Sequence, residues 1–132
     1  MMNNIELIAR AVILNRNKII LCRIKGKNWY FLPGGHVEFG EGIVASLKRE
    51  LREEIGIKVK LGKVIGVIEN FYRENRKSHH EINIIFSGTA ANRKTSSKES
   101  HIEFEYVDIK YIKNKNILPK QLKPLLIKWL KR

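Results

Sequence analysis

The chain has 132 residues, 43% of them hydrophobic, which is enough for one domain with an apolar core. Its 26 basic and 13 acidic residues give a net charge of +13, which favours polyanionic partners such as nucleotides or nucleic acid unless it only reflects the base composition of the genome. The single cysteine excludes a disulfide framework and no run of about 18 apolar residues is present, so we expect a cytoplasmic protein with no membrane partner.

The N-terminal residues predict a β-hairpin. Residues 5–15 and 18–24 are two short runs rich in β-branched side chains, and a turn-prone segment joins them. Cys22 lies in the second run, where a buried and inert thiol is a simpler interpretation than a nucleophile. An aromatic segment then leads to a Pro-Gly-Gly break. In it, Trp29 is a candidate for stacking on a nucleotide base, with packing in the sheet as the alternative.

Residues 42–55 have the periodicity of an amphipathic helix. Apolar side chains recur every three or four residues and predict the face that packs on the core: Val44, Leu47, Leu51 and Ile55. Gly56 is well suited to end this helix, because glycine readily takes the left-handed conformation that follows many helices.

The remaining residues predict three more strands and a terminal helix. Residues 58–72 and 80–90 are β-rich, with the polar connection RENRKSHH between them; 91–100 form a polar loop, and 102–109 alternate like a strand. Residues 119–132 predict a helix with Leu122, Leu126 and Trp129 towards the core, which Pro124 either kinks or delays.

His79, His80 and Glu81 begin one of these strands beside the expected pocket. Of the two histidines, His80 is the preferred candidate for catalysis or substrate binding, and solvated surface histidines are the alternative.

Three glutamates of the predicted helix, Glu50, Glu53 and Glu54, lie on one side, because successive helical residues turn by about 100°. Like charges at these spacings repel by a few tenths of a kcal/mol per pair, so something must compensate them. Carboxylate oxygens without nearby histidine or cysteine suit Mg²⁺ or Mn²⁺ rather than zinc. The alternative is a solvated face paired with basic neighbours, namely Lys48, Arg49 and Arg52.

The residues around this helix resemble the signature of the Nudix hydrolase family, G-x5-E-x7-R-E-U-x-E-E-x-G-U, where U is aliphatic. Gly35 is followed after five residues by Glu41, and seven residues later by RELREEIGI from Arg49 to Ile57, so every fixed position is met. The resemblance implies an α/β protein, a Nudix-type α/β/α sandwich with a mixed β-sheet between helices, as a single domain over residues 1–132.

The resemblance also implies a metal site on the helix. Glu50, Glu53 and Glu54 would hold Mg²⁺ or Mn²⁺, with the carbonyl of Gly34 as a further ligand. These three glutamates, together with Arg49, are the catalytic candidates, and Glu53 is our first candidate for taking a proton from water.

Other residues receive supporting roles from the resemblance. Arg49 and Glu41 would form a structural ion pair, and Gly35 and Gly56 are structural positions of the motif. Glu99 and Glu103 are candidates for a second carboxylate at the site, with ordinary surface charges as the alternative. The full structural set is Gly35, Glu41, Arg49 and Gly56.

The activity that the resemblance implies is hydrolysis of a nucleoside diphosphate linked to another group, by attack of water on phosphorus. Nucleoside triphosphates, ADP-ribose and dinucleotides are candidate substrates. Two alternatives stay open: a nucleotide- or RNA-binding module without turnover, and an RNA 5′-end pyrophosphohydrolase. The eight basic residues from Lys110 to Arg132 either bind RNA or form a solvated helix face. A monomer and a homodimer are both compatible with the sequence.

Overall fold

The computed structural model describes residues 4–90 and 101–131. Its centre is a six-stranded sheet in the order β4-β5-β1-β2-β6, with β3 paired to β1. The strands are β1 Ile5–Asn15, β2 Lys18–Ile24, β3 Gly34–His36, β4 Lys60–Glu74, β5 Lys77–Thr89 and β6 Ile102–Asp108. Strands β1 and β5 are parallel and the other pairs antiparallel, so the predicted mixed sheet is confirmed.

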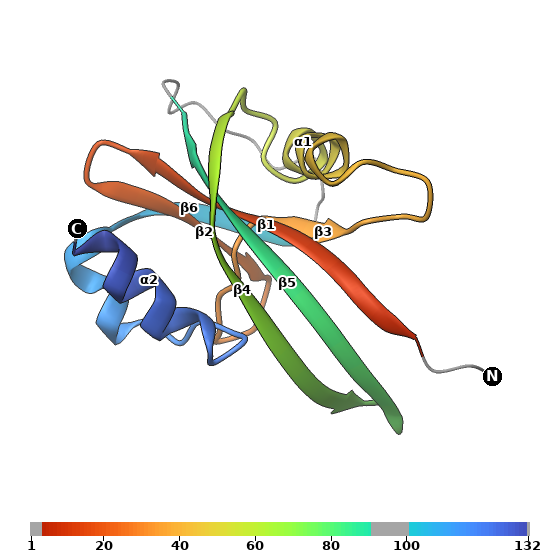
Figure 1. Cartoon of the computed structure of the whole chain (residues 1–132). Coiled ribbons are helices and arrows are strands. Elements are labelled where there is room, and N and C mark those ends of the chain that lie inside the picture. The colour runs from red at the N-terminus through yellow and green to blue at the C-terminus, as the bar shows by residue number, and fades with distance from the viewer. Residues whose placement is uncertain (1–3, 91–100, 132) are drawn as a thin grey trace.

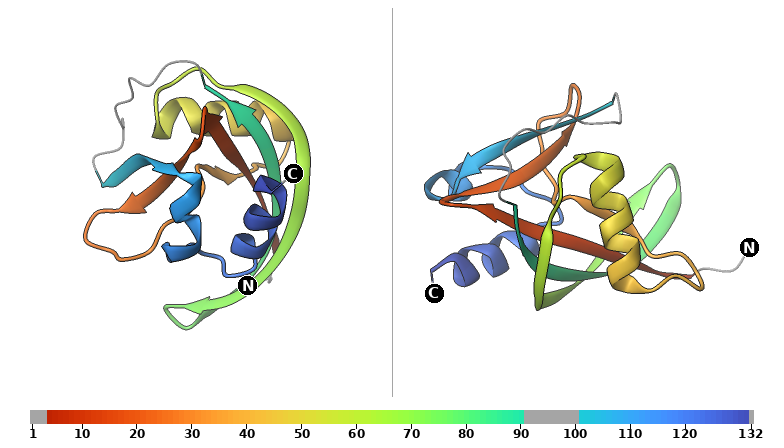
Figure 2. Two further views of the ribbon diagram at one scale, coloured as in Figure 1. Left: turned by 90° about the vertical axis from the view of Figure 1, so that its left-hand side faces the viewer. Right: turned by 90° about the horizontal axis from the view of Figure 1, so that it is seen from above.

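Helices lie on both faces of this sheet (Figure 1). Helix α1, Ile43–Glu54, covers one face, and helix α2, Leu122–Leu130, lies on the other with the short 3₁₀ helix η1, Ile109–Asn114. The same arrangement is seen from two further directions in Figure 2, where β4 curves around the edge of the sheet. The predicted α/β/α sandwich is therefore confirmed.

The alternation of side chains along β1 explains why the sheet is covered on both faces. Successive residues of a strand point to opposite faces. Ala11 packs in one cluster with Leu51 of α1, whereas Val12 packs in the other with Leu122 and Leu126 of α2. Polar residues at even-numbered positions of β1 consequently share the α2 face with Val12.

The hairpin that joins β4 and β5 is longer than the sequence predicts. The polar connection expected at residues 73–80 is wrong, because strand pairing continues to Glu74 opposite Lys77. Only Asn75 and Arg76 form the turn, both with positive φ, as the two-residue turns of twisted hairpins require. This extension brings the start of β5 into the sheet, where it takes part in the candidate site described below.

Helix α1 agrees with the expected range to within one residue at each end, and Gly56 follows it with φ +65° and its N–H bonded to the carbonyl of Leu51. Val44 was predicted to face the core, but it is exposed. Ile43 packs against the core in its place, because the buried row of this helix advances in steps of four through Leu47 and Leu51. The predicted core face is thus wrong only in its first turn.

Helix α2 begins at Leu122, so Pro124 lies in its first turn, where the backbone N–H groups have no partner within the helix. Leu122 and Leu126 are buried as expected, and Trp129 is partly buried against the same cluster. Residues 91–100, expected to form a loop, lie outside the described residues. No helix in the described ranges is long and apolar enough to cross a membrane.

Candidate active site

The loop before α1 is held to the helix by one arginine. Arg49 donates from Nε and Nη2 to the two carboxylate oxygens of Glu41, at 2.9 and 3.0 Å. This bidentate pair lowers the pKa of Glu41 to about 2 and raises the pKa of Arg49. Nη1 of Arg49 also approaches Glu50 at 3.1 Å and Glu53 at 3.4 Å. A single guanidinium therefore offsets the repulsion among these carboxylates.

The third helix glutamate, Glu54, is held by the backbone of β3. It is only 5% exposed, and its Oε1 accepts a hydrogen bond of 2.8 Å from the N–H of Gly34. Gly34 has φ +143°, and a Cβ built on it would lie 2.1 Å from the carbonyl oxygen of Ala9, so only glycine fits. At Gly35 a Cβ would lie 2.7 Å from the carboxyl carbon of Glu50. The two glycines thus allow β3 to approach the helix carboxylates directly.

The helix carboxylates differ in their access to solvent. Glu54 is buried, the side chain of Glu50 is 19% exposed and that of Glu53 is 51% exposed. In the part of the chain that the structure describes, these three do not form a compact group of metal-ligating atoms; the group that does is Glu6, His36 and Glu81.

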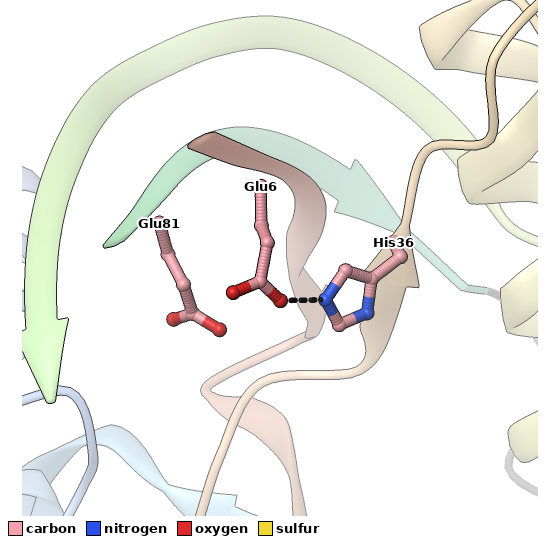
Figure 3. A group of neighbouring side chains, drawn as sticks. All are labelled: Glu6, His36 and Glu81. Carbon is pink, nitrogen blue, oxygen red and sulfur yellow. Dashed lines mark hydrogen bonds and ion pairs between the residues drawn. The ribbon is translucent and has the colours of Figure 1, made fainter. Parts of the chain in front are cut away.

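This second group comes from three strands, and its side chains point towards one another (Figure 3). Glu6 of β1 and Glu81 of β5 are register partners, and His36 ends β3. Their ligand atoms all lie within 4.8 Å of one another, and Nε2 of His36 is 2.7 Å from Oε1 of Glu6. The other oxygen of Glu6 is 2.7 Å from Nδ1 of His79. The extended hairpin is what places His79 and Glu81 here.

Hydrogen bonds and burial alter the acidity of two groups in this cluster. Partial burial raises the pKa of Glu6, but the hydrogen bonds and charges of His36 and His79 outweigh it, so this pKa lies below its ordinary value. Burial raises the pKa of Tyr72 to about 12, helped by the negative charge of Glu81, whose carboxylate accepts a bond of 3.3 Å from the Tyr72 hydroxyl. Tyr72 is therefore a neutral donor at neutral pH.

Arg10 lies between the two carboxylate groups. Its side chain donates to Oδ1 of Asn83 at 3.1 Å and to the carbonyl of Leu32 at 2.8 Å. Burial lowers the pKa of Arg10, while the charges of Glu54 and Glu81 oppose the shift. Because an arginine stays protonated even when buried, Arg10 places a fixed positive charge between the helix and β5.

A cavity of about 650 Å³ opens beside this arginine and includes Glu81 in its wall. Arg10 and the amides of Asn70 and Gln121 also line it. Its aromatic wall consists of Trp29, Phe31, Phe71 and Tyr72. Trp29, a sequence candidate for stacking on a base, thus faces a space large enough for a nucleoside.

The other candidates from the sequence lie elsewhere. His80 is 2.8 Å from Glu69 and stacks on Phe71, and its side chain lies on the opposite face of β5 from His79 and Glu81; it does not itself line the cavity. Glu103, on β6, is paired with Arg23 at 3.0 Å and belongs to neither carboxylate group. Glu99 lies outside the described residues.

The sequence alone indicated no role for Glu6, Arg10 or His36, and Glu81 was expected only beside the pocket. The sequence did carry one signal for two of these residues. Glu6 and Arg10 interrupt the apolar run of β1 and are four residues apart, so their side chains point to the same face of the strand. Their partners on β5 are about 75 positions away, and nothing in the sequence fixes that register.

Comparison with known proteins gives a family match over almost the whole chain: residues 6–131 match the NUDIX domain model. The chain is 32% identical over 113 residues to the ADP-ribose pyrophosphatase of Methanocaldococcus jannaschii, covering 83% of this chain and 62% of that protein. It is 36% identical over 69 residues to the 8-oxo-dGTP diphosphatase of Buchnera aphidicola, covering 48% and 52%. In both cases the matched region spans less than two thirds of the relative's own length.

A third relative is covered more fully. The nucleoside triphosphatase NudI of Escherichia fergusonii is 32% identical over 108 residues, which cover 73% of this chain and 77% of that protein. Among solved structures, the MutT protein from Methanosarcina mazei superposes with a TM-score of 0.80 at 22% identity, covering 99% of this chain and 96% of that one. At this identity the superposition supports the fold alone.

Proposed function

This chain belongs to the NUDIX family, and on that premise we propose that it is a divalent-metal-dependent pyrophosphohydrolase that cleaves nucleoside diphosphates linked to another group. One observation carries the proposal: the three glutamates of the motif are held in place, Glu54 by the N–H of Gly34 in β3, and Glu50 and Glu53 by the guanidinium of Arg49. Its relatives are named for ADP-ribose, 8-oxo-dGTP and nucleoside triphosphates, all of them nucleotides with a phosphoanhydride bond.

The helix carboxylates suit a magnesium or manganese ion. An oxygen of Glu50 and one of Glu53 already converge on a single cationic atom, Nη1 of Arg49. We propose that these two residues and Glu54 hold Mg²⁺ or Mn²⁺, with the carbonyl of Gly34 as a further ligand, because hard cations prefer oxygen ligands. When bound, such an ion neutralises pyrophosphate charge and makes water a better nucleophile.

The protein's own residues supply position and a base. Arg49 stays bonded to Glu41, so the loop and the helix keep their relative position when the substrate binds. Glu53 is the most exposed of the three helix glutamates, and we propose that it takes the proton from the attacking water. Trp29 and its aromatic neighbours would bind the base by stacking, and Arg10 would favour the negative charge of the diphosphate.

The proposal extends to the compartment and the partner. We propose that the activity is in the cytoplasm, since a chain whose single cysteine, Cys22, is buried has no internal disulfide that would need an oxidising compartment. The partner is a nucleotide-type small molecule.

The test is a substrate panel with one active-site variant and one control. The native protein, Glu53→Gln and Glu105→Gln are incubated with Mg²⁺ and nucleoside triphosphates, ADP-ribose, dinucleotides or 5′-triphosphorylated RNA, and products are identified by mass spectrometry. Glu105 is an exposed carboxylate on β6, paired at 3.9 Å with Lys115, and serves as the matched control. We expect cleavage by the native protein and by Glu105→Gln, and a loss of about 10²-fold or more in Glu53→Gln. An intact panel, or equal rates in all three proteins, would refute the proposal.

A further inference from the structure

We infer that Glu6, His36 and Glu81 form a second divalent-cation site, separate from the helix carboxylates and selective for a transition-metal ion such as Co²⁺ or Zn²⁺. The three residues come from β1, β3 and β5 and point towards one another (Figure 3), and Glu81 also lines the cavity. The site goes beyond the hydrolase proposal and can be tested without any activity.

The spacing of the ligand atoms fits a single ion. Bonds from oxygen or nitrogen to such ions are about 2.0–2.2 Å long, so two ligands of one ion lie at most about 4.4 Å apart. The atoms of Glu6, His36 and Glu81 lie within 4.8 Å of one another, so small side-chain rotations suffice. The main adjustment is that His36 and Glu6, now 2.7 Å apart, exchange their hydrogen bond for two bonds to the ion.

Side chains around the cluster already hold the carboxylates of Glu6 and Glu81 by hydrogen bonds, as such neighbours do in established metal sites. His79 contacts the second oxygen of Glu6 at 2.7 Å and is stacked on Tyr72, with ring centroids 4.5 Å apart and planes at 5°. Tyr72 and Asn70 each donate to Glu81, at 3.3 Å. The ligands are therefore oriented by a layer of side chains from β4 and β5 and need little ordering when a cation binds.

Charge in this cluster favours a cation. Glu81 is 6% exposed and faces a second carboxylate, an arrangement that is costly unless positive charge lies nearby. Arg10 is the fixed cation near Glu81, but its hydrogen bonds go to Asn83 and Leu32. The histidines carry charge only when protonated. A bound divalent ion removes the repulsion at neutral pH.

The amide nitrogen of Asn83 lies close to this group and could donate a hydrogen bond to an oxygen atom bound to the ion. Asn83 lies two residues beyond Glu81 and on the same face of β5. It is fully buried, its oxygen accepts from Arg10, and its amide nitrogen has no partner within the described ranges. A water or phosphate oxygen on the ion would provide an acceptor on this face.

The ligand set distinguishes this site from the helix site. Imidazole with carboxylates favours Co²⁺ or Zn²⁺, whereas oxygen-only sets suit Mg²⁺ or Mn²⁺. Glu81 also lines the cavity, so an ion here would face a substrate bound in that cavity.

The experiment measures Co²⁺ binding to the full chain, by visible absorption and by calorimetry, in the Glu50→Gln/Glu53→Gln background that weakens the helix site. We expect this double variant to bind one Co²⁺ with an absorption spectrum that shows nitrogen coordination. Adding His36→Ala should weaken this binding about tenfold or more. The side chain of His36 is 54% exposed, so its removal leaves the core intact.

The matched control is His80→Ala in the same background, since His80 is also a strand histidine bonded to a glutamate but lies outside the cluster. Glu81→Gln gives a second, independent test, with thermal unfolding to confirm that it folds. Absence of Co²⁺ binding in the double variant, or equal affinity after His36→Ala and His80→Ala, would overturn the inference. Neither result depends on whether the protein hydrolyses a nucleotide.

Discussion

At the scale of single residues, the absence of a side chain at Gly35 lets β3 approach the glutamates of α1 closely. At Gly35 a Cβ would lie 2.7 Å from the carboxyl carbon of Glu50, whereas at Gly42, the residue before α1, a Cβ would have nothing within 4 Å. Neither glycine has a positive φ, so alanine changes the available space and not the backbone preference. The pair therefore isolates the effect of displacing one carboxylate.

We predict that Gly35→Ala lowers kcat/KM by about 10²-fold, because displacements of about 1 Å at reacting groups cost this much. Gly42→Ala should retain nearly native activity. Both are measured with the best panel substrate, together with thermal unfolding midpoints to separate misfolding from misplacement. If Gly35→Ala is folded and as active as Gly42→Ala, the contact between β3 and Glu50 has no catalytic importance.

At the scale of elements, the loop before α1 depends on one ion pair. The pKa of Glu41 falls from 4.5 to about 2 on folding because Arg49 donates two hydrogen bonds to it. A depressed pKa means that the unfolded chain takes up the proton first as the pH falls. The stabilisation is therefore complete above about pH 5 and is lost progressively as the pH falls from there towards 2.

We predict that Glu41→Gln is less stable than the native protein at pH 7, and that the difference shrinks as the pH approaches 3. Urea unfolding at several pH values measures it, with Glu105→Gln as a control whose ion pair is long and exposed. A difference that is constant from pH 7 to 3 would show that Glu41 stabilises through packing and not through its charge.

The elements also show what the sequence could predict. The residues of α1 follow one another in a fixed local pattern, so the helix and its terminal Gly56 could be anticipated, while the ion pair between Glu41 and Arg49 was expected from the family resemblance. The strands β4 and β5 were also anticipated, but the length of their hairpin was not, because its turn at Asn75 and Arg76 lacks the glycine that usually marks positive φ and its strand ends are polar.

The second carboxylate group was beyond sequence reasoning for a related reason. Glu6 and Glu81 meet through parallel pairing of β1 and β5, and such a register depends on the whole sheet. His79, not His80, contacts Glu6, a choice that the register of β5 determines. Local motifs predicted the chemistry of the helix, while non-local pairing determined what surrounds it.

At the scale of the whole molecule, the net charge of +13 surrounds a site built from carboxylates. The helix and cavity glutamates repel a nucleotide at short range unless metal ions are bound, but the summed field attracts anions from a distance. Because exposed charges interact through solvent, salt screens this attraction with a Debye length of about 10 Å at 0.1 M. The net charge should consequently affect the rate at which the substrate meets the protein more than the rate of the chemical step.

We predict that kcat/KM for the best panel substrate falls about tenfold between 0.05 and 0.5 M KCl at constant free Mg²⁺, while kcat changes less than twofold. Since the field belongs to the whole surface, removing one distant charge with Lys128→Gln should reduce the salt dependence only slightly, and Lys120→Gln, at the cavity wall, should reduce it more. Initial rates measured over a range of salt concentrations give the salt dependence of kcat/KM and of kcat for the native protein and for each variant. A fall confined to kcat would place the salt effect in the chemical step, and a rate independent of salt would mean that the basic surface serves another ligand.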